Sequence, residues 1–231
     1  MSNEQFIGWL WQLLGGAAIT VELTLISLPF GMLLGLAIAL GKQSRHRLLC
    51  AVAEVFTTLF RGLPELMTLL ILYYGLQMLL QRGSELGWLT DLQIPPFAAG
   101  AIALTLVAAA YASENFLTAL RCLDRGQLEA ARSFGMRRHQ VFVRVALPQL
   151  LRTALPGLSN NCLNILKDTS LVSIIALEDL MRKSYLAAGN TKQPIVFFLL
   201  ACTIYLILSG VVLVLFNQAE RYFNRGVAHH V

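Results

Sequence analysis

Long apolar windows without charge dominate the sequence, and short basic connections separate them. Four windows, at residues 23–41, 66–81, 92–113 and 193–219, contain no Asp, Glu, Lys or Arg. About 20 predominantly apolar residues in a helix are needed to cross the hydrocarbon core of a bilayer. Most of the windows approach that length, so the pattern predicts an all-α membrane protein that crosses the bilayer several times.

Five spans account for the windows and for the charges between them. We place these spans at residues 13–40, 64–80, 96–119, 150–177 and 194–217. In the fourth span, the uncharged residues 153–166 would form a helix of roughly 21 Å, which is shorter than the core of about 30 Å. We therefore favour one interrupted span with Lys167–Ser170 at membrane depth over two short hairpin arms.

A second interruption is predicted at "FRGLPEL", residues 60–66, where Gly62 and Pro64 separate two apolar stretches. Backbone groups freed by such a break must be satisfied by protein or by a water-filled cavity. A kink between an interfacial helix and a span is the simpler alternative. No internal repeat divides the chain, so residues 1–231 are expected to form a single transmembrane domain.

Composition and charge agree with a membrane protein. The chain is 56% hydrophobic and only 13% charged, and its net charge is +5. In a membrane protein, Lys and Arg report which loops face the cytoplasm. Seven arginines against Asp124 and Glu129 in the connection 120–152 place that connection inside. The N-terminus is then periplasmic and the C-terminus cytoplasmic. The scattered cysteines and histidines predict neither disulfides nor a metal site.

The basic connection contains a helical element, "EAARSFGMRRHQVFVRVALPQ", at residues 129–149. Leu128, Ala131 and Phe134 share one face of a helix, and Gly135 is suited to end it in the left-handed conformation. A second helical stretch, 137–147, then runs to a break at Pro148. This pattern predicts a compact helix at the cytoplasmic surface that docks into a partner. A loop that only sets topology is the alternative.

The spacing of this element resembles a known signature. "EAA", three residues, Gly135, nine residues, Val145 and then "LP" is similar to the EAA motif of ABC-importer permeases, with Val145 in place of the usual Ile. "FRGLPEL", "AAYASENF" at 109–116, "RGQLEAA" at 125–131 and "LPGLSNNCLNILKDTSLVS" at 155–173 resemble segments of the polar amino acid branch, of the histidine, lysine–arginine–ornithine, glutamine and octopine type. Leu117 departs from that branch, many members of which have Arg there.

This resemblance implies the fold and the partners of a type I ABC importer. Two permease subunits would form the pore, a pair of cytosolic ATPase subunits would drive it, and a periplasmic binding protein would deliver the amino acid across the bacterial inner membrane. Region 125–148 would be the coupling-helix region that binds the ATPase. The residues implied in coupling are Glu129, Ala130, Ala131, Phe134, Gly135 and Arg137.

The chain is not expected to hydrolyse ATP itself. "GLAIALGKQS", residues 35–44, briefly suggests a phosphate-binding loop. Five residues instead of four separate its glycines, and Gln43 stands where Ser or Thr would hold magnesium. The chain is therefore expected to be non-catalytic and to carry no cofactor, with ATP and Mg²⁺ bound by the partner ATPase.

Charged residues within membrane spans are costly and mark functional positions. Glu22, Glu114, Lys167 and Asp168 are the four here. Glu114 could receive a substrate ammonium group, or it could pair with Lys167 or Arg121. Lys167 and Asp168 could contact substrate, or they could cap and pair at the helix break. The candidate substrate-binding residues are Tyr111, Glu114, Ser159, Asn160, Asn164, Lys167, Asp168, Thr169 and Ser170.

The expected function is ATP-driven uptake of a polar, preferably basic, amino acid or a derivative of one. Glutamine, cystine or an opine are alternative substrates within the same class. A membrane anchor for a cytosolic enzyme is the alternative from another class, since it would need the docking helix but not the charges within the spans. The sequence leaves open whether the second permease is a copy of this chain or a paralogue.

Overall fold

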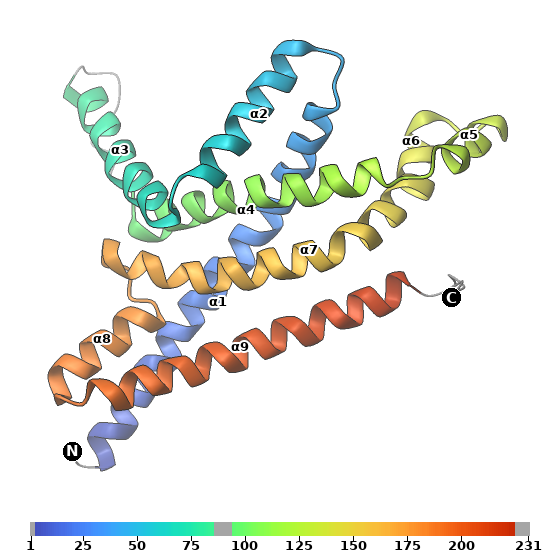
Figure 1. Cartoon of the computed structure of the whole chain (residues 1–231). Coiled ribbons are helices and arrows are strands. Elements are labelled where there is room, and N and C mark those ends of the chain that lie inside the picture. Colours follow the sequence, from blue (N-terminus) through green and yellow to red (C-terminus); the bar gives the residue numbers. More distant parts are fainter. Residues whose placement is uncertain (1–2, 86–93, 225–231) are drawn as a thin grey trace.

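The computed structural model describes residues 3–85 and 94–224, and in these residues the chain is built from helices (Figure 1). Asp91 and Arg225, two of the connection and tail charges, lie outside the described residues. The elements, in chain order, are α1 (Asn3–Lys42), α2 (Arg47–Gly62), α3 (Glu65–Glu85), α4 (Pro96–Arg121), α5 (Arg125–Ser133), α6 (Arg138–Val141), the π-helical η1 (Phe142–Ala146), α7 (Leu147–Asp168), the 3₁₀-helical η2 (Thr169–Ile175), α8 (Leu180–Thr191) and α9 (Pro194–Phe223).

Three of the described helices, α1, α4 and α9, are long and apolar enough to cross a bilayer individually. Together, α2 and α3 pass as one broken span that bends by 111° at the break between them. The expected fourth span corresponds to α7 with η2, but α7 is not apolar enough by itself because polar residues such as Asn160, Asn161 and Lys167 interrupt it. The five predicted positions therefore all fall on helices, although only three of those helices have the composition of independent spans.

Helix α4 is central because small residues let its neighbours approach closely. Its alanines at 108, 109, 110 and 112 are fully buried. A Cβ atom added to Gly31 of α1 would lie 2.6 Å from the Cβ of Ala108, and one added to Gly35 would lie 2.8 Å from that of Ala112. Small residues at such a crossing favour close backbone packing between membrane helices. The crossing of α1 and α4 thus fixes the frame on which the other helices pack.

The two predicted breaks on either side of the core have different outcomes. The break at Gly62 and Pro64 is confirmed, since α2 ends at Gly62 and α3 begins at Glu65 after the sharp bend. The break at Pro148 is wrong as a helix end. Helix α7 begins at Leu147 directly after η1, so the chain stays helical through Pro148. Proline has no N–H to donate, and the π-helical turn before it accommodates the missing hydrogen bond.

The interrupted fourth span is present, and it is followed by a helix that was not predicted. The α-helical geometry stops at Asp168 and tightens to 3₁₀ over η2, which ends at Ala176 in the left-handed conformation (φ 63°). Asp179 then caps α8, accepting from the backbone N–H groups of Met181 and Arg182. Helix α8 packs between α1 and α9 near the N-terminal end of the chain (Figure 1).

Candidate functional site

A polar cavity of about 140 Å³ lies between α4 and α7 at the end of α2. Its lining residues are Arg61, Tyr111, Glu114, Asn115, Gly157, Asn160, Asn161 and Asn164. Tyr111, Glu114, Asn160 and Asn164 were among the residues predicted from the sequence. Arg61, Asn115 and Gly157 were not, although Arg61 lies in the "FRGLPEL" stretch, and Asn161 belongs to the polar run expected along span four. The cavity therefore joins three of the segments that carry the resemblance.

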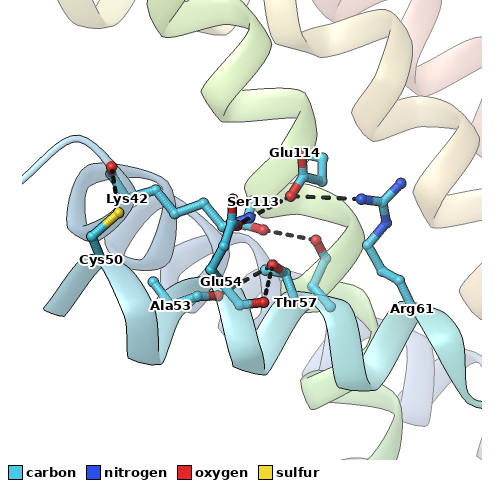
Figure 2. A network of polar contacts seen from close by, with 9 residues as sticks. Lys42, Cys50, Ala53, Glu54, Thr57, Arg61, Ser113 and Glu114 are labelled. Carbon is cyan, nitrogen blue, oxygen red and sulfur yellow. Dashed lines mark hydrogen bonds and ion pairs between the residues drawn. The ribbon is translucent and has the colours of Figure 1, made fainter. Parts of the chain in front are cut away.

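Glu114 is the centre of an ion-pair network at the wall of this cavity (Figure 2). Lys42 Nζ lies 2.6 Å from Glu114 Oε1 and 2.5 Å from Glu54 Oε2. Arg61 Nη1 approaches the same Glu114 oxygen at 3.6 Å. The Lys42 side chain is only 5% exposed, whereas that of Glu114 is 30% exposed. The proposed pairing of Glu114 with Lys167 or Arg121 is therefore wrong, because Lys42 at the end of α1 reaches it first.

Arg61 lies between an acid and an aromatic ring. Its guanidinium carbon is 5.8 Å from the ring centroid of Tyr111, within the range of a cation–π contact. The Tyr111 hydroxyl in turn donates to Glu65 Oε1 at 3.3 Å. The pairing of Arg61 with Glu114 is longer than a hydrogen bond, so this guanidinium has donors left for another acceptor. Arg61 comes from the last turn of α2, which the break at Gly62 and Pro64 directs towards α4.

The asparagine face of α7 supplies neutral polar groups to the same space. Asn161 Nδ2 donates to the carbonyl oxygen of Ala108 at 3.0 Å. Its Oδ1 is buried and has no hydrogen-bond partner among the described residues. A buried acceptor without a partner is rare in native structures and favours a bound donor. Asn115 packs directly over Gly157, where an added Cβ would lie 2.5 Å from Asn115 Oδ1. The small residue at 157 keeps the cavity wall open for Asn115.

The other predicted substrate residues, Ser159 and Lys167–Ser170, do not line the cavity. Asp168 makes no side-chain cap for η2, and its carboxylate forms no ion pair with Lys167 within 4.0 Å. The capping and pairing expected at this break are therefore wrong. Thr169 is buried and its hydroxyl donates to the carbonyl of Leu166 at 2.7 Å, which satisfies it within the helix. Asp168 still interacts electrostatically with Lys167, and also with Glu65 and Tyr111 next to the cavity.

The predicted docking element lies at one end of α4 and α7, where α5 and α6 form a compact corner (Figure 1). Asp124 Oδ1 accepts from the Gly126 N–H at 2.8 Å and starts α5. Gly135 has φ 77°, so the predicted left-handed helix stop is confirmed. The predicted shared face is only partly right. Ala131 is buried but Phe134 is 88% exposed, because α5 ends at Ser133 and Phe134 leaves the helix as its C-cap.

The remaining predicted coupling residues are at the surface of this corner. Glu129 and Ala130 are exposed on α5, and Arg137 is exposed ahead of α6. The Arg137 backbone N–H donates to Gln140 Oε1 at 2.9 Å, which fixes the turn between the two short helices. These contacts fix the turn that carries the exposed Phe134 between α5 and α6.

Comparison with known proteins shows which family shares this sequence and architecture. Residues 28–227 match the family model described as "Binding-protein-dependent transport system inner membrane component". The histidine/lysine/arginine/ornithine transport system permease protein HisQ of Escherichia coli (strain K12) is 39% identical over 215 residues, covering 93% of this chain and 94% of that protein. The nopaline transport system permease protein NocQ of Agrobacterium fabrum is 39% identical over 222 residues, covering 95% of this chain and 94% of that protein.

A solved structure of an amino acid ABC transporter with histidines shares the fold, with a TM-score of 0.79, 29% identity, and coverage of 96% of this chain and 99% of that one. The predicted all-α fold of an ABC-importer permease is thereby confirmed. The chain belongs to the family of inner-membrane components of binding-protein-dependent transport systems.

Proposed function

We propose that this chain carries a polar amino acid, with a basic one preferred, through the inner membrane as half of an ATP-driven importer. The observation that supports this most directly is the cavity in which Arg61, Glu114 and Asn161 meet. An amino acid carries a carboxylate and an ammonium group, and the cavity offers a guanidinium, a carboxylate and a neutral acceptor. Relatives named as permeases of histidine/lysine/arginine/ornithine and nopaline transport systems support the same substrate class.

Each group of such a substrate has a complementary group in the cavity. Arg61 offers donors to a carboxylate, because its contact with Glu114 is long at 3.6 Å. Asn161 Oδ1 offers an acceptor to an ammonium or guanidinium group. Glu114 attracts a cation but is already held by Lys42 at 2.6 Å. The cationic group of a basic substrate would therefore replace Arg61 as the second partner of Glu114, and the pairing of Glu114 with Lys42 would stay in place.

The partners of this permease follow from its exposed surfaces. The α5–α6 corner, with the exposed Phe134 between the two helices, would bind the cytosolic ATPase subunit. That subunit would hold ATP and Mg²⁺. Glu22 is exposed in the middle of α1, where a charge facing lipid would be costly, so we assign this face to the second permease subunit. A periplasmic binding protein would deliver the amino acid at the opposite end, with the N-terminus periplasmic and the C-terminus cytoplasmic.

The test is amino-acid-stimulated ATP hydrolysis by the complex reconstituted with its ATPase and binding protein. Basic amino acids should stimulate hydrolysis more than neutral or acidic ones. Glu114→Gln should lower the stimulation by basic substrates at least tenfold, since a hydrogen bond to a charged group contributes about 1.5–3 kcal/mol. Glu85→Gln, a carboxylate remote from the cavity at the end of α3, is the matched control and should behave as wild type.

Two outcomes would contradict the proposal. If every amino acid stimulates ATP hydrolysis by the Glu114→Gln complex as strongly as by the wild-type complex, the cavity does not select the substrate. If no amino acid of the panel stimulates hydrolysis while the ATPase remains bound and active, the substrate is not a basic amino acid but a derivative such as an opine.

A further inference from the structure

A second and larger cavity, of about 860 Å³, lies beside the α5–α6 corner and is separate from the candidate substrate site. Side chains from the ends of α1 and α4, from the connections that follow them, and from α5, α6 and η1 surround it. Five arginines line it, and no Asp or Glu does: Arg45, Arg121, Arg125, Arg132 and Arg138. A cavity with such a one-sided charge attracts anions.

None of these five arginines is neutralised within the described part of the chain. The described ion pairs within 4.0 Å use Lys42, Arg61 and Lys183 as their cations. Glu54 interacts with Arg121 only at a distance, Asp124 uses its carboxylate to cap α5, and Glu129 on α5 is in none of the described ion pairs. The five guanidinium groups thus present unpaired donors to one shared space. Guanidinium forks match the geometry of phosphate oxygens.

The position of the cavity along the spanning helices favours a phosphate group from a lipid over a free phosphate ion. Leu40 lies two residues before the end of α1, and Leu120 one residue before the end of α4, which are both spanning helices. The cavity therefore opens where these spans reach the membrane surface. Apolar side chains, including Leu40, Leu120 and Phe142, line it together with the arginines. An anionic group with an attached apolar chain fits this mixed lining better than a free ion does.

The faces of α5 separate this cavity from the proposed ATPase surface. Arg125, Leu128 and Arg132 line the cavity, and their spacing places them on one side of the helix. Ala130, which is proposed to contact the ATPase, lies on the opposite side of the helix. Glu129, four residues after Arg125 and three before Arg132, borders the arginine side without lining the cavity. The same short helix can therefore face a lipid with its arginine side and the ATPase with the side that carries Ala130.

We propose that this arginine cavity binds the phosphate headgroup of an anionic phospholipid from the cytoplasmic leaflet. Bound there, the headgroup would offset part of the positive charge of the five arginines and join the ends of α1 and α4 to the α5–α6 corner. Clustered basic residues at the cytoplasmic surface attract anionic lipids. Each Lys or Arg raises the affinity roughly fivefold. Because the corner is also the proposed ATPase surface, lipid composition would regulate coupling. That last consequence rests on the proposed function, whereas the lipid site itself does not.

Lipid retention by the purified full-length chain, measured by native mass spectrometry, tests the site. The chain is equilibrated in mixed micelles that contain equal amounts of phosphatidylglycerol and phosphatidylcholine. Wild type should retain phosphatidylglycerol in preference to phosphatidylcholine. Arg132→Ala/Arg138→Ala should weaken that retention roughly 25-fold, from the fivefold expected per arginine. Arg144→Ala/Arg152→Ala removes the same charge from the same region outside the cavity and should retain the lipid as wild type does.

Other outcomes overturn the proposal. Equal retention of the two lipids by wild type, or equal losses in the two double variants, would show only a general attraction of the basic surface. Displacement of the lipid by millimolar inorganic phosphate would assign the cavity to a soluble anion. If a co-assembled ATPase subunit removes the lipid, an acidic face of that subunit is the occupant instead. Melting temperatures of both double variants check that they fold, and we expect no change because all four arginines lie outside the packed core.

Discussion

The ion pair between Lys42 and Glu114 gives the most specific prediction for stability. It joins the end of α1 to the C-terminal third of α4 at 2.6 Å, and the Lys42 side chain is only 5% exposed. Glu114→Gln keeps a hydrogen-bond acceptor of the same size but removes the charge. Lys42→Met removes the opposite charge and keeps the length of the side chain. The pair is therefore suited to a double-mutant cycle.

The expected size of the coupling follows from the geometry. Removing one partner of a buried ion pair costs about 3–5 kcal/mol. Two features of this pair lower that figure, since Glu114 is 30% exposed and Lys42 keeps Glu54 at 2.5 Å. We therefore expect a coupling free energy of about 2 kcal/mol between the two positions.

The assay is reversible unfolding of the full-length chain in mixed micelles, followed by circular dichroism for wild type, both single variants and the double variant. The pair Lys183–Glu178, at 2.7 Å but with Glu178 62% exposed, is the matched control and should give additive changes. If Lys42→Met and Glu114→Gln are additive as well, the two side chains do not form the network seen in the structure.

Further predictions concern packing, capping and coupling. Gly31→Val should destabilise the chain by about 1–3 kcal/mol through overpacking against Ala108, whereas Gly8→Val, with nothing near its Cβ, should show no such loss in the same unfolding assay. Burial raises the pKa of the Asp179 carboxyl to about 6. The protonated carboxyl therefore favours the folded state. This contribution to stability is present at low pH and is lost as the pH rises from about 4 through about 6. Unfolding measured across this range should show that Asp179→Asn removes the dependence, and Asp179→Ala should also lose about 1 kcal/mol of capping. Gly135→Ala should cost about 1 kcal/mol because φ is 77° there, and it should weaken co-purification of the ATPase. Phe134→Ala should leave the melting temperature unchanged but reduce ATPase binding, and equal binding would exclude Phe134 as an anchor.

The parts of the fold that the sequence predicts are those set by local pattern. Uncharged windows locate α1, α4 and α9, and Gly62, Pro64 and Gly135 mark the turns where backbone geometry demands them. The predicted break at Pro148 is wrong because a π-helical turn before it accommodates the missing N–H donor. Whether such a turn forms depends on the surrounding packing, which the local sequence does not show. Helix α8 was missed because it is short and polar, although its N-cap Asp179 precedes it in the sequence.

The candidate site is less predictable because it depends on contacts between distant segments. Glu114 and Tyr111 were found because a charge and a phenol within a span are unusual. Their partners were not found, since Lys42 and Arg61 lie at the ends of other helices, 72 and 53 positions away from Glu114. The bend between α2 and α3 directs Arg61 into the cavity, and no local pattern encodes that direction. Lys167 and Asp168 were expected in the site because they are charged, but the 3₁₀ turn after Asp168 leaves them outside the lining.

The central claim is that this permease moves a basic amino acid inward at the expense of ATP. The most direct measurement is uptake of radiolabelled arginine, glutamine and aspartate into proteoliposomes that contain the assembled importer, with its binding protein outside in the transport orientation and ATP on the cytoplasmic side. The account predicts ATP-dependent accumulation of arginine above glutamine, little accumulation of aspartate, and a selective loss of arginine uptake in Glu114→Gln. Preferred uptake of aspartate, or arginine uptake that is equal with and without ATP, would contradict it.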